Sequence, residues 1–180
     1  MGSEMCIRDR SLLEYIHCSK IVGKSNIIFT NIGEKYRDKL RKYGKVYKES
    51  VENLHFKSIC VLDPSAKKQL SKTDGKRFKY FVIGGILGDF PRRRRTAKIL
   101  KKIKERRNLG KRQFSTDNAI YVAKEILKGR SLEDFKFKNG IEIPIGKNLS
   151  VILPFRFVIK DGKPLLPEGL IDYLKKRRTI

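Results

Sequence analysis

The chain has 180 residues and carries 43 Lys and Arg against 19 Asp and Glu, a formal net charge of +24. A hydrophobic fraction of 39% is typical of one globular domain and argues against disorder, and no apolar run approaches the roughly 20 residues that cross a bilayer. With 3 scattered cysteines, 2 histidines and no CxxC pair, the sequence argues against a disulfide framework and against a metal site. We expect a reduced, cytoplasmic protein without a membrane segment.

The positive charge predicts a polyanionic partner, either nucleic acid or a particle rich in nucleic acid such as the ribosome. Adaptation to heat is the alternative explanation, but it raises Glu together with Lys. The number of acidic residues is not raised together with the number of basic residues here, so we favour the polyanionic partner.

The first ten residues, MGSEMCIRDR, show neither helical nor strand periodicity, and EMCIRDR resembles a translated sequencing-adaptor read-through. We expect residues 1–10 to be non-native and extended or mobile, followed by a single domain at 11–180. The predicted elements of that domain are, in chain order, a helix at 11–20, a strand at 26–31, a helix at 34–43, strands at 57–63 and 78–83, helices at 96–107 and 116–128, strands at 135–143 and 150–159, and a helix at 170–178.

Two of these strands have continuous apolar cores, at 59–62 and 78–83. Such strands are buried on both faces, which is typical of a parallel sheet. Alternating strands and helices predict an α/β domain with a mostly parallel sheet flanked by helices.

Glycines follow the second of these strands at Gly84, Gly85 and Gly88. Ligands of open α/β sheets bind outside the carboxyl ends of the strands, and glycine lets the backbone approach a ligand closely. The segments VLDP (61–64) and NLGKRQFSTD (108–117) supply two further walls of the same pocket. An ordinary tight turn is the alternative for each loop, because neither GxGxxG nor a Walker sequence is present.

Five segments in this order resemble one family: VLDPSA (61–66), FKYFVIGGILGDFPRRRRT (78–96), RRNLGKRQFSTDNAI (106–120), LPFRFV (153–158) and GKPLLPEGL (162–170). The family is the SPOUT-class methyltransferases whose characterised fungal member methylates an arginine of a small-subunit ribosomal protein. The resemblance covers about residues 11–176.

The resemblance implies a C-terminal deep trefoil knot, an exception to the rule against knots, and S-adenosylmethionine bound among the knot loops without a metal. The family normally opens with a strand that the first ten residues replace here, so we expect that strand and its active-site groups to be missing. The implied cofactor-binding residues are Leu62, Asp63, Pro64, Gly84, Gly85, Gly88, Leu109, Gly110, Gln113, Ser115 and Thr116.

An arginine nucleophile arrives protonated, so the enzyme needs carboxylates to orient the guanidinium and help remove a proton. Asp89 is the first candidate for this catalytic role because it follows the glycine turn, and Glu168 and Asp117 come next. The alternatives are a surface turn for Glu168 and a charge at a helix N-terminus for Asp117. We expect His17 and His55 to be ordinary helix and loop residues.

The four arginines Arg92, Arg93, Arg94 and Arg95 oppose the dipole of the predicted helix that they precede. We expect them to dock the enzyme on ribosomal RNA or on an acidic protein surface beside a ribosomal-protein substrate. A SPOUT-type RNA methyltransferase and a non-catalytic ribosome-binding module stay as alternatives. The absence of Trp and the placement of most aromatics inside strands disfavour stacking on RNA bases. The sequence is compatible with a monomer or a dimer.

Overall fold

The computed structural model describes residues 3–84 and 102–176, with side chains from Arg10 onward. Short 3₁₀ turns lie at Lys24–Asn26, Val51–Asn53 and Leu132–Asp134. The helices and strands are, in order, α1 (Ser3–Val22), β1 (Ile28–Phe29), α2 (Glu34–Arg41), β2 (Lys45–Val46), β3 (Ile59–Leu62), α3 (Asp74–Arg77), β4 (Tyr80–Ile83), β5 (Arg106–Arg107), α5 (Thr116–Lys128), β6 (Lys136–Gly146), β7 (Leu149–Lys160), β8 (Lys163–Pro164) and α6 (Leu170–Lys176).

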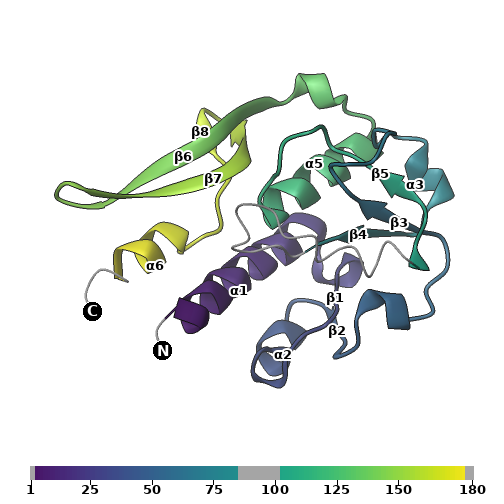
Figure 1. The fold of residues 1–180 in the computed structure, drawn as a ribbon, viewed down its shortest axis with the longest axis horizontal. Coiled ribbons are helices and arrows are strands. Elements are labelled where there is room, and N and C mark those ends of the chain that lie inside the picture. The colour runs from purple at the N-terminus through teal and green to yellow at the C-terminus, as the bar shows by residue number, and fades with distance from the viewer. Residues whose placement is uncertain (1–2, 85–101, 177–180) are drawn as a thin grey trace.

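A parallel sheet with strand order β4-β3-β5, called here the central sheet, lies on the right in Figure 1, next to α5. All four residues of β3 are buried, and Cys60 pairs with Phe81 while Leu62 pairs with both Ile83 and Arg107. A second, two-stranded parallel sheet joins β1 to β2. The parallel pairing of the two apolar strands is therefore confirmed.

The third sheet differs from the expectation of a mostly parallel arrangement, because β6, β7 and β8 are antiparallel. Only Lys147 and Asn148 separate β6 from β7, and Asn148 has a φ of 58°. A two-residue connection forms a hairpin, whereas parallel neighbours need a crossover of a dozen or more residues. The long hairpin reaches away from the central sheet and over α6 in Figure 1.

Two further expectations from the sequence are wrong in the structure. The backbone of 3–10 belongs to α1 and is helical rather than extended. The expected helix at 96–107 does not reach its predicted end, since Arg106 and Arg107 form β5; its residues before 102 lie outside the described part of the chain. The backbone of β3 holds β5 in place, because Val61 N–H donates to Glu105 O at 2.9 Å and Asp63 N–H donates to Arg107 O at 2.8 Å.

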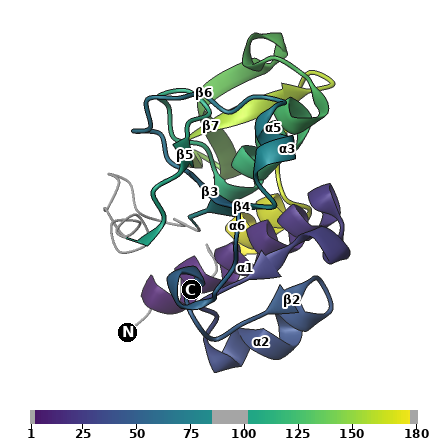
Figure 2. The same cartoon turned by 90° about the vertical axis from the view of Figure 1, so that its right-hand side faces the viewer.

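Helix α1 lies between the layers of the molecule and packs against α5, α2 and α6. Figure 2 shows the hairpin above, the central sheet and α5 in the middle, and α1 and α2 below. Apolar clusters fill the spaces between these elements: one joins α5 to the central sheet, one joins the hairpin to α6, and one joins α1 to α2 and β1. Within the described residues, no helix is long and apolar enough to span a membrane.

The start of α5 is tied to the hairpin through Asn118, which is fully buried. Its Oδ1 accepts from Val158 N–H at 2.8 Å, and its Nδ2 donates to Leu165 O at 2.9 Å. Gly129 ends the helix in the left-handed conformation, with a φ of 114°. This fixed N-terminus positions the residues that precede α5 against the edge of the central sheet.

Candidate functional site

A pocket lies at the carboxyl edge of the central sheet, where the loops after β3, β4 and β5 converge. The first loop contributes residues 62–64, the second contributes Gly84, and the third contributes segments of 109–116. The lining residues are Leu62, Asp63, Pro64, Ile83, Gly84, Leu109, Gly110, Arg112, Gln113, Phe114, Thr116 and Ala119.

The structure therefore brings together eight of the residues that the sequence assigned to a cofactor: Leu62, Asp63, Pro64, Gly84, Leu109, Gly110, Gln113 and Thr116. Ser115 is buried beside them, and its hydroxyl turns toward Asp117 rather than lining the pocket. Gly85 and Gly88 lie outside the described residues. That these residues bind a cofactor stays a prediction.

Asn108 holds two of the pocket loops together. Its Nδ2 donates to Ala66 O at 2.8 Å, and its Oδ1 accepts from Gly110 N–H at 2.9 Å. Gly110 has a φ of +88°, a conformation that residues with a Cβ rarely adopt. The backbone of the third loop is thus set by an amide side chain and one glycine.

Asp63 is almost fully buried at the end of β3 and turns the first loop. Its carboxylate accepts from Ser65 N–H at 2.9 Å and from Ser65 Oγ at 2.8 Å. Arg106 Nη1 lies 3.4 Å from the same carboxylate. Asp63 therefore shapes the pocket through its contacts with neighbouring residues.

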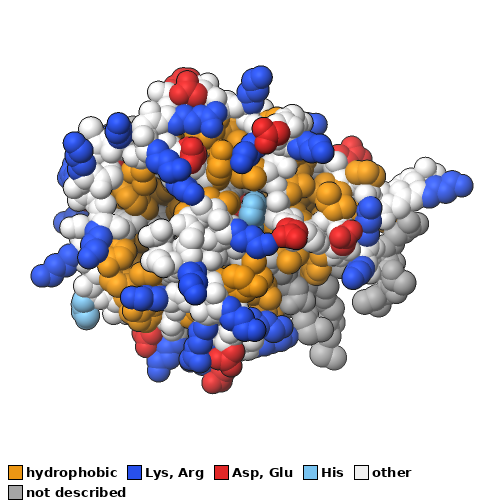
Figure 3. All heavy atoms as spheres, turned by 180° about the vertical axis from the view of Figure 1, so that it is seen from behind, with side chains coloured by type: hydrophobic (Ala, Val, Ile, Leu, Met, Phe, Trp, Pro, Cys, Tyr) orange, Lys and Arg blue, Asp and Glu red, His pale blue; other side chains and the backbone are white. Residues whose placement is uncertain are grey.

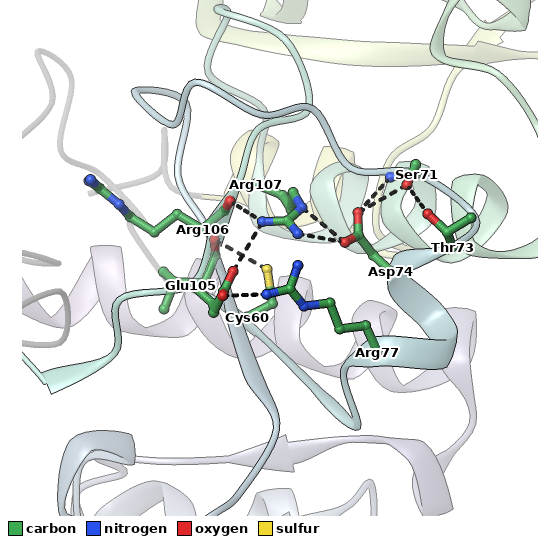
Figure 4. Close-up of polar contacts among 9 residues, drawn as sticks. Cys60, Ser71, Thr73, Asp74, Arg77, Glu105, Arg106 and Arg107 are labelled. Atoms are coloured by element: carbon green, nitrogen blue, oxygen red, sulfur yellow. Dashed lines mark hydrogen bonds and ion pairs between the residues drawn. The ribbon is translucent and has the colours of Figure 1, made fainter.

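A buried ion pair between Arg107 and Asp74 anchors β5 (Figure 4). Arg107 Nε and Nη2 lie 2.9 and 2.8 Å from Asp74 Oδ1, and each side chain is only 6% exposed. Asp74 also accepts from the N–H and Oγ of Ser71. Burial by itself raises the pKa of Asp74, but the hydrogen bonds from Arg107 and Ser71 outweigh it and leave the pKa below its ordinary value. The carboxylate is therefore charged and firmly paired.

Asp117, one of the predicted catalytic residues, is fully buried at the start of α5. Ser115 Oγ donates to Asp117 Oδ1 at 2.6 Å, and His17 Nδ1 lies 2.8 Å from Oδ2. Both carboxylate oxygens are thus occupied, and Asp117 is absent from the pocket lining. This arrangement agrees with the alternative of a charge at a helix N-terminus, and it gives His17 a specific partner that the sequence did not suggest.

Glu168, the second candidate, lies in a separate surface hollow with Leu13, Ile16, His17, Lys20 and Gly169. Its side chain is 84% exposed and pairs with Lys20 Nζ at 2.5 Å. The structure therefore places Glu168 in an exposed turn, away from the lining of the pocket between the loops. Asp89, the first candidate, and Arg92–Arg95 lie outside the described residues.

Glu14 is a buried acid that the sequence analysis did not single out. It is 2% exposed on α1, at the junction with α5, and contacts the backbone of Thr116. Burial, followed by the charge of Asp117, raises the pKa of Glu14 from 4.5 to about 8. Its position four residues before the buried Cys18, on one face of a helix, was the available signal.

Three comparisons place this geometry among known proteins. The family model "Protein arginine N-methyltransferase SFM1-like" matches residues 4–179. Protein arginine N-methyltransferase SFM1 of Saccharomyces cerevisiae is 37% identical over 186 residues, which cover 92% of this chain and 87% of that protein.

Solved structures of the yeast arginine methyltransferase SFM1 have the same fold. The complex with SAM has a TM-score of 0.80 at 33% identity and covers 92% of this chain and 84% of that one. The complex with SAH also has a TM-score of 0.80, at 35% identity, and covers 92% and 88%. The chain belongs to the SFM1-like family of protein arginine N-methyltransferases.

Proposed function

We propose that the protein transfers a methyl group from S-adenosylmethionine to an arginine of a ribosomal protein. Family membership supports arginine methylation, and the relatives solved with SAM and SAH support the donor. The observation that carries the proposal is the convergence of three loops around one pocket at the carboxyl edge of the parallel sheet.

The residues around this pocket fit an adenosine-containing ligand. Leu62, Ile83 and Leu109 offer apolar surface for an adenine ring, while Gln113 and Thr116 offer hydrogen-bonding groups. Gly84 and Gly110 leave the backbone open to close approach. The pocket would hold the donor and leave its methyl group to an in-line attack, for which positioning supplies much of the rate.

The proposal includes the SPOUT class and its trefoil knot. In that class the loops of a threaded C-terminal segment surround the donor. The three converging loops and the parallel order β4-β3-β5 are compatible with this arrangement.

We propose the ribosomal partner on the basis of charge, and a cytoplasmic location on the basis of the few, scattered cysteines. Residues 92–112 contain twelve basic residues and one acid, Glu105. On the face drawn in Figure 3, Lys and Arg side chains are spread widely and outnumber Asp and Glu. We propose that Arg92–Arg95 add a concentrated docking segment to this basic surface, directed at ribosomal RNA or an acidic protein.

Donor binding is tested by calorimetry with S-adenosylmethionine on Gly110→Val, with Gly162→Val as the matched control. Both glycines have positive φ, +88° and +75°, so both variants strain the backbone. Only Gly110 lies in the pocket. We expect Gly110→Val to weaken binding at least about tenfold, roughly 1.4 kcal/mol, and Gly162→Val to bind as the unmodified chain does. Equal affinities in all three proteins would place the donor elsewhere.

Docking is tested with purified ribosomal particles. Neutralising Arg93 and Arg94 should weaken association and flatten its dependence on salt, because fewer phosphate contacts release fewer counterions. Donor binding should stay unchanged in the same variant. If the variant binds the particles with an unaltered affinity and an unaltered dependence on salt, Arg93 and Arg94 are not part of a docking surface.

A further inference from the structure

One oxygen of the Glu14 carboxylate has no hydrogen-bond partner among the described residues, although the side chain is 2% exposed. The other oxygen, Oε1, lies 3.3 Å from Arg10 Nε. A buried acceptor without a donor is costly, and such groups in folded proteins call for an explanation. A ligand that brings N–H donors would satisfy the free oxygen, Oε2.

The carboxylate of Glu14 lies beside Thr116, a residue of the donor pocket, and contacts its backbone. Helices α1 and α5 pack together at this point, as Figure 1 shows. Among the acids that the structure describes, Glu14 thus combines proximity to the pocket with an oxygen that is free to accept.

A guanidinium already lies against this carboxylate. The Arg10 side chain approaches Glu14 and also lies over the ring of Phe155, 5.9 Å from its centroid. A carboxylate together with an aromatic face is the combination with which proteins hold arginine. An arginine of a substrate protein offers the same chemical group.

We propose that Glu14 is the catalytic carboxylate of this enzyme, which binds the substrate guanidinium where Arg10 lies in this structure and accepts the proton released on methylation. This role rests on the proposed function, because it names the acid that serves the same reaction. Arg10 then competes with the substrate for Glu14. The buried Asp117, held by Ser115 and His17, adds negative charge behind the site.

The reaction balances with one proton transferred. A guanidinium nitrogen forms a bond to the methyl carbon, the bond between that carbon and sulfur breaks, and the sulfonium becomes a neutral thioether. The nitrogen passes one proton to the Glu14 carboxylate, so the methylated guanidinium keeps a single positive charge. No oxidant, reductant or metal takes part.

The surroundings of Glu14 prepare it for this proton. Its pKa of about 8 results from burial and the charge of Asp117, while Arg10 opposes the rise. Tyr15 and Cys18 lie near Glu14 on the same helix. Burial raises the pKa of both side chains, so both are neutral. A base that titrates near neutral pH is well matched to general base catalysis. We expect the rate of methyl transfer to increase as the pH rises through about 8.

The test compares Glu14→Gln with Glu125→Gln in methyl transfer to small-subunit ribosomal proteins. Gln keeps the shape of the side chain and one acceptor oxygen, but it cannot take a proton. We expect Glu14→Gln to lower the turnover rate by about 100-fold or more, to keep the affinity for S-adenosylmethionine within about twofold and to remove the rise of activity with pH. Glu125 lines neither of the two pockets described above and pairs with Lys128. Its variant should therefore behave as the unmodified enzyme.

Arg10→Ala supplies a second test. Removing the competing guanidinium should lower KM for the ribosomal protein and leave kcat unchanged. A Glu14→Gln protein with unaltered turnover and pH profile would overturn the role of Glu14 alone, and a raised KM in Arg10→Ala would overturn the competition. An unmodified enzyme that binds the donor yet methylates no arginine would overturn the proposed function, and this role with it.

Discussion

We predict that the buried ion pair between Asp74 and Arg107 is required for the stability of the protein and for the position of the third pocket loop. Asp74→Asn keeps the size of the side chain but removes its charge. Arg107 then stays buried at 6% exposed, without the carboxylate that lies 2.8 Å away. Its remaining acidic neighbour, Glu105, is 3.4 Å away and 44% exposed, so it compensates only in part.

Breaking a buried pair by removing one partner costs about 3–5 kcal/mol, because an uncompensated charge stays in the protein interior. For a domain of this size, that cost corresponds to a fall in Tm of about 6–20 °C. The N–H and Oγ–H of Ser71, which donate to the Asp74 carboxylate, would face an amide in the variant, and this adds to the loss of stability. Because Arg107 forms β5, the loop that begins at Asn108 should loosen, and affinity for the donor should fall as well.

The assay is urea unfolding of Asp74→Asn beside Arg77→Gln. Arg77 pairs with Glu105 at 2.6 Å, and Figure 4 draws this pair together with Asp74. The side chain of Arg77 is 55% exposed. An exposed pair contributes at most about 1 kcal/mol, so the two variants should differ by at least about 2 kcal/mol. Equal losses in the two variants would refute the reasoning from burial.

The remaining predictions concern the acids. Glu14 has a folded-state pKa of about 8, above its ordinary 4.5, so the stability it contributes is fully present below pH 4.5 and is lost as the pH rises through 8. Urea unfolding should therefore show Glu14→Gln gaining stability relative to the unmodified chain from pH 4.5 to pH 8, and a constant difference would contradict the raised pKa. Glu168→Gln should leave both the Tm and methyl transfer unchanged, since its pair with Lys20 is exposed; lost transfer would restore its catalytic assignment. Asp89→Asn should spare particle association and retain methyl transfer if Glu14 is the proton acceptor, and abolished transfer would return that role to Asp89.

The apolar pattern of the sequence predicted those parts of the fold that burial on both faces determines. Residues 59–62 and 80–83 have no polar side chain except the phenol of Tyr80, a pattern typical of a parallel sheet. In the structure β3 is fully buried, whereas β4, at one edge of the described sheet, is half-buried. The loops after such strands must meet at one edge. The family resemblance named the eight cofactor-binding candidates that the structure places around one pocket.

Other features depend on contacts that periodicity does not record. The pair Arg106–Arg107 has the composition of a helix surface and becomes a strand because the free edge of β3 takes up its backbone. The tight turn at 147–148 makes the hairpin antiparallel, and the predicted strands stopped short of it. Glu14 is buried because α5 covers its side of α1, so its importance was visible only once the two helices packed together.

The most direct test is the transfer of tritium from methyl-labelled S-adenosylmethionine to ribosomal fractions that are then separated into protein and RNA. The account predicts label on arginine in a small-subunit protein with the unmodified chain, and a loss of about 100-fold or more with Glu14→Gln. Label in RNA alone would contradict it and establish the RNA methyltransferase alternative, and no label in either fraction would leave a binding module.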